Sequence, residues 1–406
     1  MLDQNTKIIV VGGGAAGFFA AIRCAELNPR AQVSILERGK SVLEKVRISG
    51  GGRCNVTHAC WTPAELIKHY PRGAKELLGP FHRFACGDTV DWFEKRGVPL
   101  KIEADGRIFP TSDDSQTIIG CLRHSALNAG VEVLTSVRVD GIFFEKNNWK
   151  ILTEEKILIA DKILIASGSN TRVWEMLQAL GHSIVAPVPS LFTFNIKDER
   201  IQGLAGISVP TALVQIEKSK LEAKGPLLIT HWGLSGPAIL KLSAWGARAL
   251  ADLNYHFSIL VNWVNQKEEV VFEDLSHIKT SDPKKQVHAN PPFGLTSRLW
   301  KSLLHSALIP EEKKWADLSK KELQKICQQL CACSLSVNGK STFKEEFVTA
   351  GGVELKEVNF KTFESKLFPG LFFAGEVLNV DAITGGFNFQ AAWTGGWIAG
   401  EALAKD

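Results

Sequence analysis

The sequence lacks the features that would mark a membrane or secreted protein. No stretch approaches the ~20 consecutive apolar residues that span a bilayer. The first residues, Met1 to Lys7, have neither the basic region nor the long apolar run of a secretory signal. The eight cysteines are scattered over 406 residues and form no compact disulfide framework. We therefore expect a cytoplasmic protein with no membrane partner.

The sequence also lacks a strong excess of charge of either sign, because the formal net charge is only +4. Without a cluster of basic residues, an RNA partner is not favoured. Internal repeats and low-complexity segments are missing as well. Hydrophobic residues make up 45% and charged residues 22%, which is ordinary for a globular protein. A chain of this length is expected to fold into two or three domains.

Two groups of cysteines lack the pattern of a metal or redox site. Cys327, Cys331 and Cys333 have no nearby histidine or second cysteine pair, so no metal site is predicted. Cys54 and Cys60 have five residues between them, one more than the redox pair of disulfide reductases. We interpret them as a buried or phosphate-loop cysteine and its neighbour rather than a redox dithiol.

A glycine fingerprint follows the first apolar run of the chain. Ile8 to Val11 predicts a buried strand, and the next six residues read Gly-Gly-Gly-Ala-Ala-Gly. Gly12 permits a tight turn, Gly14 allows a pyrophosphate to approach the backbone, and Gly17 lets the helix pack on the strand. The free N–H groups at the start of this helix, around Ala15 and Ala16, would receive the phosphates.

A second strand, Gln32 to Leu36, ends in an acidic residue. Glu37 lies twenty residues after Gly17, and its carboxylate can accept hydrogen bonds from both ribose hydroxyls of an adenosine, with Arg38 beside it. This order of elements, a strand, a glycine turn, a helix and a second strand that ends in Glu37, predicts a dinucleotide site. The alternative is a glycine turn in an unrelated α/β protein.

Three later segments favour FAD over NAD as the dinucleotide. The backbone around Val139, in the run 131–142, could clamp an adenine. The strand at 163–165 ends in a segment similar to the "ATG" segment of two-dinucleotide-binding-domain flavoproteins, and the late strand at 371–374 ends in an acidic residue. The residues predicted to contact FAD here are Ala166, Ser167, Gly168, Gly375 and Glu376.

A triple-glycine loop supplies a further candidate contact. Three consecutive glycines, Gly50 to Gly52, cost conformational entropy and imply a backbone that lies close against another group. Gly51 and Gly52 would approach the pyrophosphate and the ring edge, together with Cys54. Arg53 would pair with a phosphate or the flavin C2 carbonyl, and Asn55 would hydrogen-bond the ring. A surface turn is the alternative.

The segment 381–390 predicts a helix whose first residues point back at the cofactor. The partial positive charge of a helix N-terminus stabilises an anion, and reduced flavin carries its negative charge at N1–C2=O. Such a helix would favour the reduced cofactor. The residues assigned to this contact are Asp381, Gly386, Phe387, Asn388 and Phe389.

The order of elements predicts an α/β fold with a discontinuous first domain. Residues 1–190 and 340–406 would form a Rossmann-like FAD-binding domain, and residues 191–339 an inserted domain with a helical part at about 265–331. The runs 131–142 and 149–159 carry the β-branched residues of antiparallel strands. Two prolines in 186–192 bar helix and interior strand and mark a crossing between the domains.

Four separated motifs resemble the HI0933-like (YhiN/BaiN-like) flavoprotein family, whose members are labelled NAD(P)/FAD-dependent or aminoacetone-oxidase-like oxidoreductases. They are 49–55 (SGGGRCN), 105–110 (DGRIFP), 230–237 (THWGLSGP) and 375–381 (GEVLNVD), the last followed by 384–390 (TGGFNFQ). The resemblance covers essentially the whole chain. It implies a two-dinucleotide-binding-domain type of FAD domain, an inserted β-barrel-like domain and a small helical subdomain. This chain has Ala-Ser-Gly-Ser at 166–169 where the family has "ATGG".

The resemblance also implies an FAD-dependent oxidoreductase. The expected chemistry is hydride transfer through flavin N5 to an activated C=C bond or similar acceptor in a small molecule. Since the sequence has no second complete GxGxxG, NAD(P)H would dock transiently. The alternatives are an aminoacetone-oxidase-like amine oxidase that uses O₂ and a reductase of uridine in RNA. Weak candidates for a catalytic role are His231, His58 and Cys54.

Overall fold

The computed structural model describes residues 5–341 and 348–405, which divide into two compact units. Unit 1 comprises residues 5–188 and 348–405, and unit 2 comprises residues 189–341. The sequence analysis placed the two boundaries at 190/191 and 339/340. Residues 1–4, 342–347 and 406 of the predicted first domain lie outside the described residues.

Unit 1 is built on a seven-stranded sheet with the order β20-β21-β22-β10-β1-β2-β6. The five strands from β22 to β6 are parallel, and β20 and β21 add an antiparallel edge. Their bounds are β1 Lys7–Val11, β2 Gln32–Glu37, β6 Glu132–Thr135, β10 Lys162–Ile165, β20 Val358–Asn359, β21 Glu364–Ser365 and β22 Leu371–Phe373. The central strands are continuous apolar runs because both faces of such a sheet are buried.

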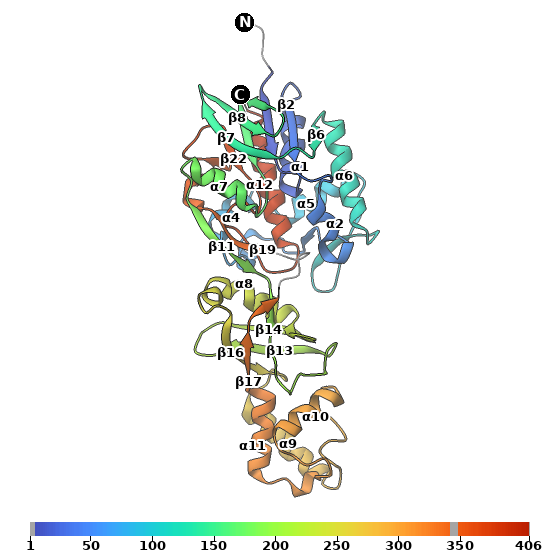
Figure 1. Cartoon of the computed structure of the whole chain (residues 1–406). Coiled ribbons are helices and arrows are strands. Elements are labelled where there is room, and N and C mark those ends of the chain that lie inside the picture. Colours follow the sequence, from blue (N-terminus) through green and yellow to red (C-terminus); the bar gives the residue numbers. More distant parts are fainter. Residues whose placement is uncertain (1–4, 342–347, 406) are drawn as a thin grey trace. The chain divides into compact units, whose positions relative to one another are not determined.

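The two ends of the chain meet in this unit, because the last helix packs on the first (Figure 1). α1 spans Ala15–Leu27 and α12 spans Phe387–Leu403. A β-carbon at Gly396 would lie 2.7 Å from the Ala16 carbonyl oxygen, and one at Gly400 would lie 2.6 Å from that of Ala20. The glycines of α12 therefore allow the two helix backbones to touch.

The run 131–142 is two strands rather than one, which corrects the antiparallel assignment. β6 is parallel to β2 and forms the edge of the main sheet, whereas β7 (Val139–Glu145) begins an antiparallel sheet with β8 (Asn148–Thr153) and β9 (Ile157–Ala160). The turn between them has Ser136 at φ 59°. A β-branched run alone does not reveal where the chain changes sheets.

The proline-containing segment between the units is itself a strand. β11 (Ile184–Ser190) includes Pro187 and Pro189 and pairs with β19 (Val348–Val353) in a two-stranded ribbon. Both strands of such a ribbon are edges, so a residue that lacks an N–H is tolerated. The two prolines are incompatible with an interior strand of a sheet, as the sequence analysis stated. They are compatible with a strand in a two-stranded ribbon, which the sequence analysis did not consider.

The remaining elements of unit 1 surround the main sheet. They include the antiparallel sheet of β3 (Thr57–His58), β5 (Arg107–Pro110) and β4 (Leu100–Ile102). The helices are α2 Glu44–Ile48, α3 Pro63–Leu66, α4 Ala74–Phe81, α5 Cys86–Glu94, α6 Ser115–Asn128 and α7 Thr171–Ala179. Asp114 caps α6 by accepting a hydrogen bond from the Gln116 N–H at 2.8 Å.

Unit 2 contains an antiparallel sheet with the order β17-β16-β13-β14-β15-β12-β18. The first and last strands are separated only by Gly339, whose carbonyl accepts from Asn195 N at 3.0 Å, so the sheet closes on itself. This is the predicted β-barrel-like domain. Its elements are β12 Thr193–Asn195, β13 Ser208–Ile216, β14 Glu222–Thr230, β15 Gly233–Ser235, α8 Pro237–Asp252, β16 His256–Asn262, β17 Cys333–Asn338 and β18 Lys340–Ser341.

The predicted helical subdomain lies between β16 and β17. It consists of α9 (Glu268–Ser281), α10 (Ser297–Ser306) and α11 (Lys320–Cys331), and its apolar side chains join the barrel in one core. Ser319 and Glu322 form a capping box at the start of α11, as their spacing predicts. Within the described residues, none of the helices has the length and hydrophobicity needed to cross a membrane.

Candidate functional site

The turn between β1 and α1 has the shape of a phosphate cradle. A β-carbon at Gly12 would lie 2.4 Å from the Ala166 carbonyl oxygen, and one at Gly17 would lie 2.0 Å from that of Gly12. Both positions therefore exclude a side chain. Gly14, in contrast, has no atom within 4 Å of its β-carbon position. The helix begins beside this open space, at Ala15 and Ala16, so its free N–H groups are available to an anion.

Glu37 lies at the end of β2 and binds the same turn. Its carboxylate accepts from Gly13 N at 3.0 Å and from Gly39 N at 2.6 Å. The segment leading to Val139 lies against it, because Val137 N donates to the Glu37 carbonyl at 2.9 Å. The segment predicted to clamp the adenine therefore passes the end of β2, where Glu37 lies. The Arg38 side chain is exposed.

The triple-glycine loop follows α2 and also faces open space. Gly50, Gly51 and Gly52 have φ values of 58°, 69° and 86°, a region that side chains disfavour. At Gly51 and Gly52, no atom lies within 4 Å of the β-carbon position. The backbone conformation rather than crowding by the protein requires these two glycines, which leaves their outer side free for a ligand.

Arg53 is engaged by protein carboxylates. Its Nη1 lies 2.6 Å from Glu103 Oε1 and 3.4 Å from Asp113 Oδ1, and its guanidinium stacks on Phe109 at 3.9 Å. The hydrogen bond that Arg53 donates to the Glu103 carboxylate is the main cause of the raised pKa of Arg53. The Arg53 side chain therefore links the triple-glycine loop to the β4–β5 hairpin. Its predicted contact with a phosphate or the flavin stays a prediction.

Two asparagines fix the start of α12. With its amide oriented to satisfy both partners, Asn55 accepts from Gly386 N at 2.9 Å and donates to the Thr57 carbonyl at 3.0 Å. Asn388 accepts from Ala382 N at 2.9 Å and donates to the Ala382 carbonyl at 3.1 Å. The triple-glycine loop and the helix N-terminus, which the sequence analysis assigned to one site, therefore meet in the structure.

Of the two aromatic residues at this helix start, Phe387 is buried and Phe389 is partly buried. Phe387 stacks on His69 with ring centres 4.1 Å apart, and Phe389 stacks on Trp393 at 5.6 Å. Asp381, also predicted to contact the cofactor, is fully buried and paired with Arg72. The Phe387 and Asp381 side chains are therefore engaged by the protein, so any cofactor contact from these two residues would be through the backbone.

The carboxyl ends of β10 and β22 carry the remaining predicted residues. Gly375 follows β22 with φ 78°, and its β-carbon position lies 3.1 Å from the Ala16 side chain. Glu376 binds Lys45 Nζ at 2.5 Å and Thr349 N at 3.2 Å. Its carboxylate also lies 3.7 Å from the β-carbon position of Gly168. Ligands of open α/β sheets bind at this edge.

The candidates for a catalytic role differ in their surroundings. Burial lowers the pKa of His58, whose Nε2 lies 3.1 Å from the Asp105 carbonyl and whose ring stacks on Phe387 at 4.7 Å. A lowered pKa leaves the imidazole neutral near pH 7, which makes it a poor proton donor. Burial raises the pKa of the Cys54 thiol to about 12 and makes this thiol unreactive. His231 is exposed and lies in unit 2.

Sequence reasoning missed Lys45 and the segment 348–353, both of which contact Glu376 beyond the end of β22. The segment reads Val-Thr-Ala-Gly-Gly-Val, and Gly351 and Gly352 have φ values of 140° and 125°. β-Carbons there would lie 2.7 Å from Pro187 Cα and 2.5 Å from the Val377 carbonyl oxygen. The adjacent glycines inside an apolar run were the available signal, since they mark a close backbone approach.

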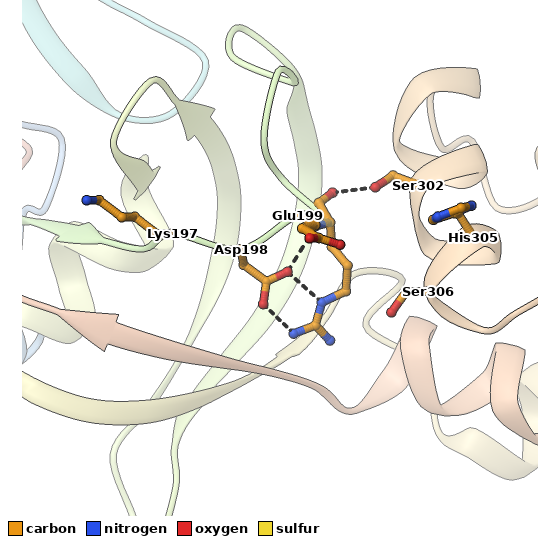
Figure 2. Close-up of a pocket in the computed structure, with 7 residues that line it drawn as sticks. Lys197, Asp198, Glu199, Ser302, His305 and Ser306 are labelled. Atoms are coloured by element: carbon orange, nitrogen blue, oxygen red, sulfur yellow. Dashed lines mark hydrogen bonds and ion pairs between the residues drawn. The ribbon is translucent and has the colours of Figure 1, made fainter.

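A separate cavity of about 400 Å³ lies within unit 2 (Figure 2). Its lining includes Arg200, which pairs with Asp198 at 2.7 Å and whose carbonyl accepts from Ser302 Oγ at 2.8 Å. The Arg200 guanidinium also donates to Gln329 and Ser334. None of the residues predicted to bind FAD lines this cavity. Among the described residues, no group of three potential ligands is arranged for a metal ion.

The residues at the carboxyl edge of the sheet fit FAD. The cradle consists of the glycine turn, the acidic end of β2 and the open triple-glycine loop. A β-carbon would clash with the backbone in the glycine turn and would strain the backbone in the triple-glycine loop. Three buried polar atoms at the same edge have no hydrogen-bond partner: Ser167 Oγ, Thr349 Oγ1 and Asn379 Oδ1. The fold and site thus define a Rossmann-like dinucleotide-binding domain.

The sequence profile described as "HI0933-like protein Rossmann domain" matches residues 6–402, so the chain belongs to this family. It is an FAD-dependent oxidoreductase. The chain is 26% identical to a 3-dehydro-bile acid delta(4,6)-reductase of Clostridium scindens, over 98% of this chain and 99% of the relative. It is 26% identical to a ribosomal RNA dihydrouridine synthase of Haemophilus influenzae (100% of both chains) and 27% identical to one of Escherichia coli (98% of both).

Solved flavoprotein structures share the fold. A 3-ketosteroid-delta4-(5alpha)-dehydrogenase from Rhodococcus jostii superposes with a TM-score of 0.53 at 13% identity, over 100% of this chain and 98% of that one. An open flavocytochrome c3 fumarate reductase gives 0.51 at 16% identity, over 99% and 78%. At these identities the likeness shows the fold alone. Family and fold confirm the resemblance that the four sequence motifs indicated.

Proposed function

We propose that the protein is a reductase that transfers a hydride from NAD(P)H, through flavin N5, to a C=C bond conjugated with a carbonyl in a small organic molecule. The reaction balances as NAD(P)H, one proton and the C=C bond giving NAD(P)⁺ and a CH–CH bond. Bound FAD would supply the hydride transfer. The names of the three relatives carry this proposal, because each of them describes such a reduction.

The two kinds of substrate named for these relatives share one chemical feature. A 3-dehydro-bile acid with double bonds at 4 and 6 is a conjugated ketone, and uridine becomes dihydrouridine by reduction of a ring C=C that is conjugated with a carbonyl. In such systems a hydride adds at the carbon remote from the carbonyl, and a proton adds beside it. The proposed acceptor is therefore defined by this conjugated C=C bond rather than by either of the two substrates.

The proposed roles of the chain are to bind and orient the cofactor. The turn at Gly12–Gly17 would hold the pyrophosphate, and Glu37 the adenosine ribose. The loop at Gly51 and Gly52 and the start of α12 would approach the ring, where the helix N-terminus stabilises negative charge. The remaining predicted contacts, at 166–168 and 375–376, would come from the ends of β10 and β22.

A second candidate function is reduction of uridine in ribosomal RNA, which two relatives' names favour. The net charge of +4 on 406 residues argues against it, since RNA binding depends on phosphate neutralisation by clustered basic residues. A small-molecule substrate is therefore the first choice. RNA binding that weakens steeply with salt would reverse this order.

The decisive experiment is anaerobic mixing of the FAD-loaded protein with NADH or NADPH in a stopped-flow instrument. We expect one of them to bleach the flavin band at about 450 nm. A conjugated enone, added next, should restore the band faster than uridine-containing RNA does. If neither nucleotide bleaches the band but an aminoketone does, and O₂ restores it, the protein is an amine oxidase and the proposal is wrong.

A further inference from the structure

Thr349 has a buried side-chain hydroxyl that lacks a hydrogen-bond partner. The residue lies beside Glu376, just beyond the carboxyl end of β22. Its side chain is only 2% exposed, and Oγ1 accepts and donates no hydrogen bond. A buried hydroxyl in that state costs about 1–3 kcal/mol, and native proteins satisfy nearly all such groups. The group that completes this hydroxyl is therefore expected to be a ligand or a water molecule.

Two other unpartnered polar atoms lie on segments that contact the same place. Of seven such atoms in the described residues, Ser167 Oγ, Thr349 Oγ1 and Asn379 Oδ1 come from segments joined through Glu376. Glu376 accepts from Thr349 N at 3.2 Å and lies beside Gly168, and Asn379 follows it by three residues. The other four atoms belong to Arg23, His58, Trp263 and His288.

The backbone holds Thr349 firmly in this position. Gly351 and Gly352 bring β19 against β11 and against the segment 377–378, at distances that leave no room for a β-carbon. Val353 N donates to the Val377 carbonyl at 2.9 Å, and Asn379 N donates to the Val353 carbonyl at 3.1 Å. These contacts fix the path of β19, so Thr349 would need little reordering to meet a ligand, and less entropy would be lost on binding.

We propose that Thr349 Oγ1, with Ser167 Oγ and Asn379 Oδ1, hydrogen-bonds the polar part of bound FAD. The set offers two hydroxyls, which donate or accept, and one carbonyl oxygen, which only accepts. FAD carries hydroxyl, N–H and carbonyl groups that complement both kinds. The inference rests on the proposed cofactor site at the ends of β10 and β22. It adds Thr349 and Asn379 to the predicted contacts.

The test compares Thr349→Val with the wild-type protein in two measurements. Titration of apoprotein with FAD should show about fivefold weaker binding, the usual effect of losing one neutral hydrogen bond. The melting temperature of the apoprotein should stay the same or rise, because valine replaces a hydroxyl that has no partner. Thr349→Ser keeps the hydroxyl and should bind FAD like wild type.

Thr193→Val is the matched control. Thr193 is equally buried, at 2% exposure, but its Oγ1 donates to the Ser341 carbonyl at 3.1 Å in unit 2. This variant should lower the melting temperature and leave FAD affinity unchanged, the opposite pattern. Ser167→Ala provides a second hydroxyl deletion in case Thr349→Val does not fold.

Three outcomes would overturn the inference in distinguishable ways. Equal FAD affinity of wild type, Thr349→Val and Ser167→Ala would mean that buried water alone completes these hydroxyls. Weak binding by Thr349→Ser as well as Thr349→Val would mean that packing of the methyl group matters instead. Failure of the wild-type protein to bind FAD would remove the cofactor site itself, and the inference with it.

Discussion

At the scale of single residues, Glu37 shows how one carboxylate serves both fold and site. Its two oxygens accept from Gly13 N and Gly39 N, so the same side chain fixes the glycine turn and the end of β2. Hydrogen bonds to a charged acceptor are worth about 1.5–3 kcal/mol each. The adenosine contact predicted for Glu37 therefore depends on a carboxylate that the backbone already orients.

We expect Glu37→Gln to weaken FAD binding at least about tenfold, because a neutral amide offers only one acceptor oxygen and turns its NH₂ group toward an N–H donor. Titration of the apoprotein with FAD measures the change. Glu132→Gln is the control, since Glu132 is exposed on β6 of the same sheet, where it accepts a hydrogen bond from Ser34 Oγ at 2.9 Å. Equal losses in both variants would point to a general effect of charge and contradict a specific role.

At the scale of elements, the triple-glycine loop combines unusual backbone conformation with open space. Gly51 has φ 69° and no neighbour within 4 Å of its β-carbon position, and Gly97 in the turn after α5 has φ 78° and the same open surroundings. An alanine at either position costs about 1–2 kcal/mol in the left-handed region. Only the first position faces the proposed cofactor.

Gly51→Ala and Gly97→Ala should therefore lose similar stability but differ in FAD affinity. We expect only Gly51→Ala to weaken binding, by an order of magnitude or more, because its methyl group occupies the space proposed for the cofactor. Chemical denaturation of the apoproteins and FAD titration separate the two effects. Unchanged FAD affinity in Gly51→Ala would show that the loop is a surface turn.

Local patterns in the sequence predicted the elements that local physics controls. The glycine fingerprint, the acidic end of β2 and the helix start within 381–390 are each encoded by a few neighbouring residues. The change of sheet near Ser136 and the strand containing Pro187 depend on partners far along the chain, so the sequence analysis described neither. Thr349 was missed for the same reason, because its significance comes from packing against 376–379.

At the scale of the whole molecule, the two units have separate hydrophobic cores. Unit 1 is assembled from both ends of the chain and contains all the residues predicted to bind FAD. Unit 2 has the barrel and the helical subdomain around a core of its own. Ligand binding stabilises only the unit whose folded state holds the ligand.

This separation predicts how FAD changes thermal unfolding. Calorimetry of the apoprotein should resolve two transitions, one for each core. FAD at one hundred times its dissociation constant should stabilise unit 1 by about 2.7 kcal/mol and raise its transition by several degrees, while the transition of unit 2 stays in place. Trp263 in unit 2 and Trp393 in unit 1, both buried, allow each transition to be assigned by substitution with phenylalanine. If FAD shifted both transitions equally, the two cores would unfold as one cooperative structure, and the cofactor would stabilise the inserted unit as well as the domain that binds it.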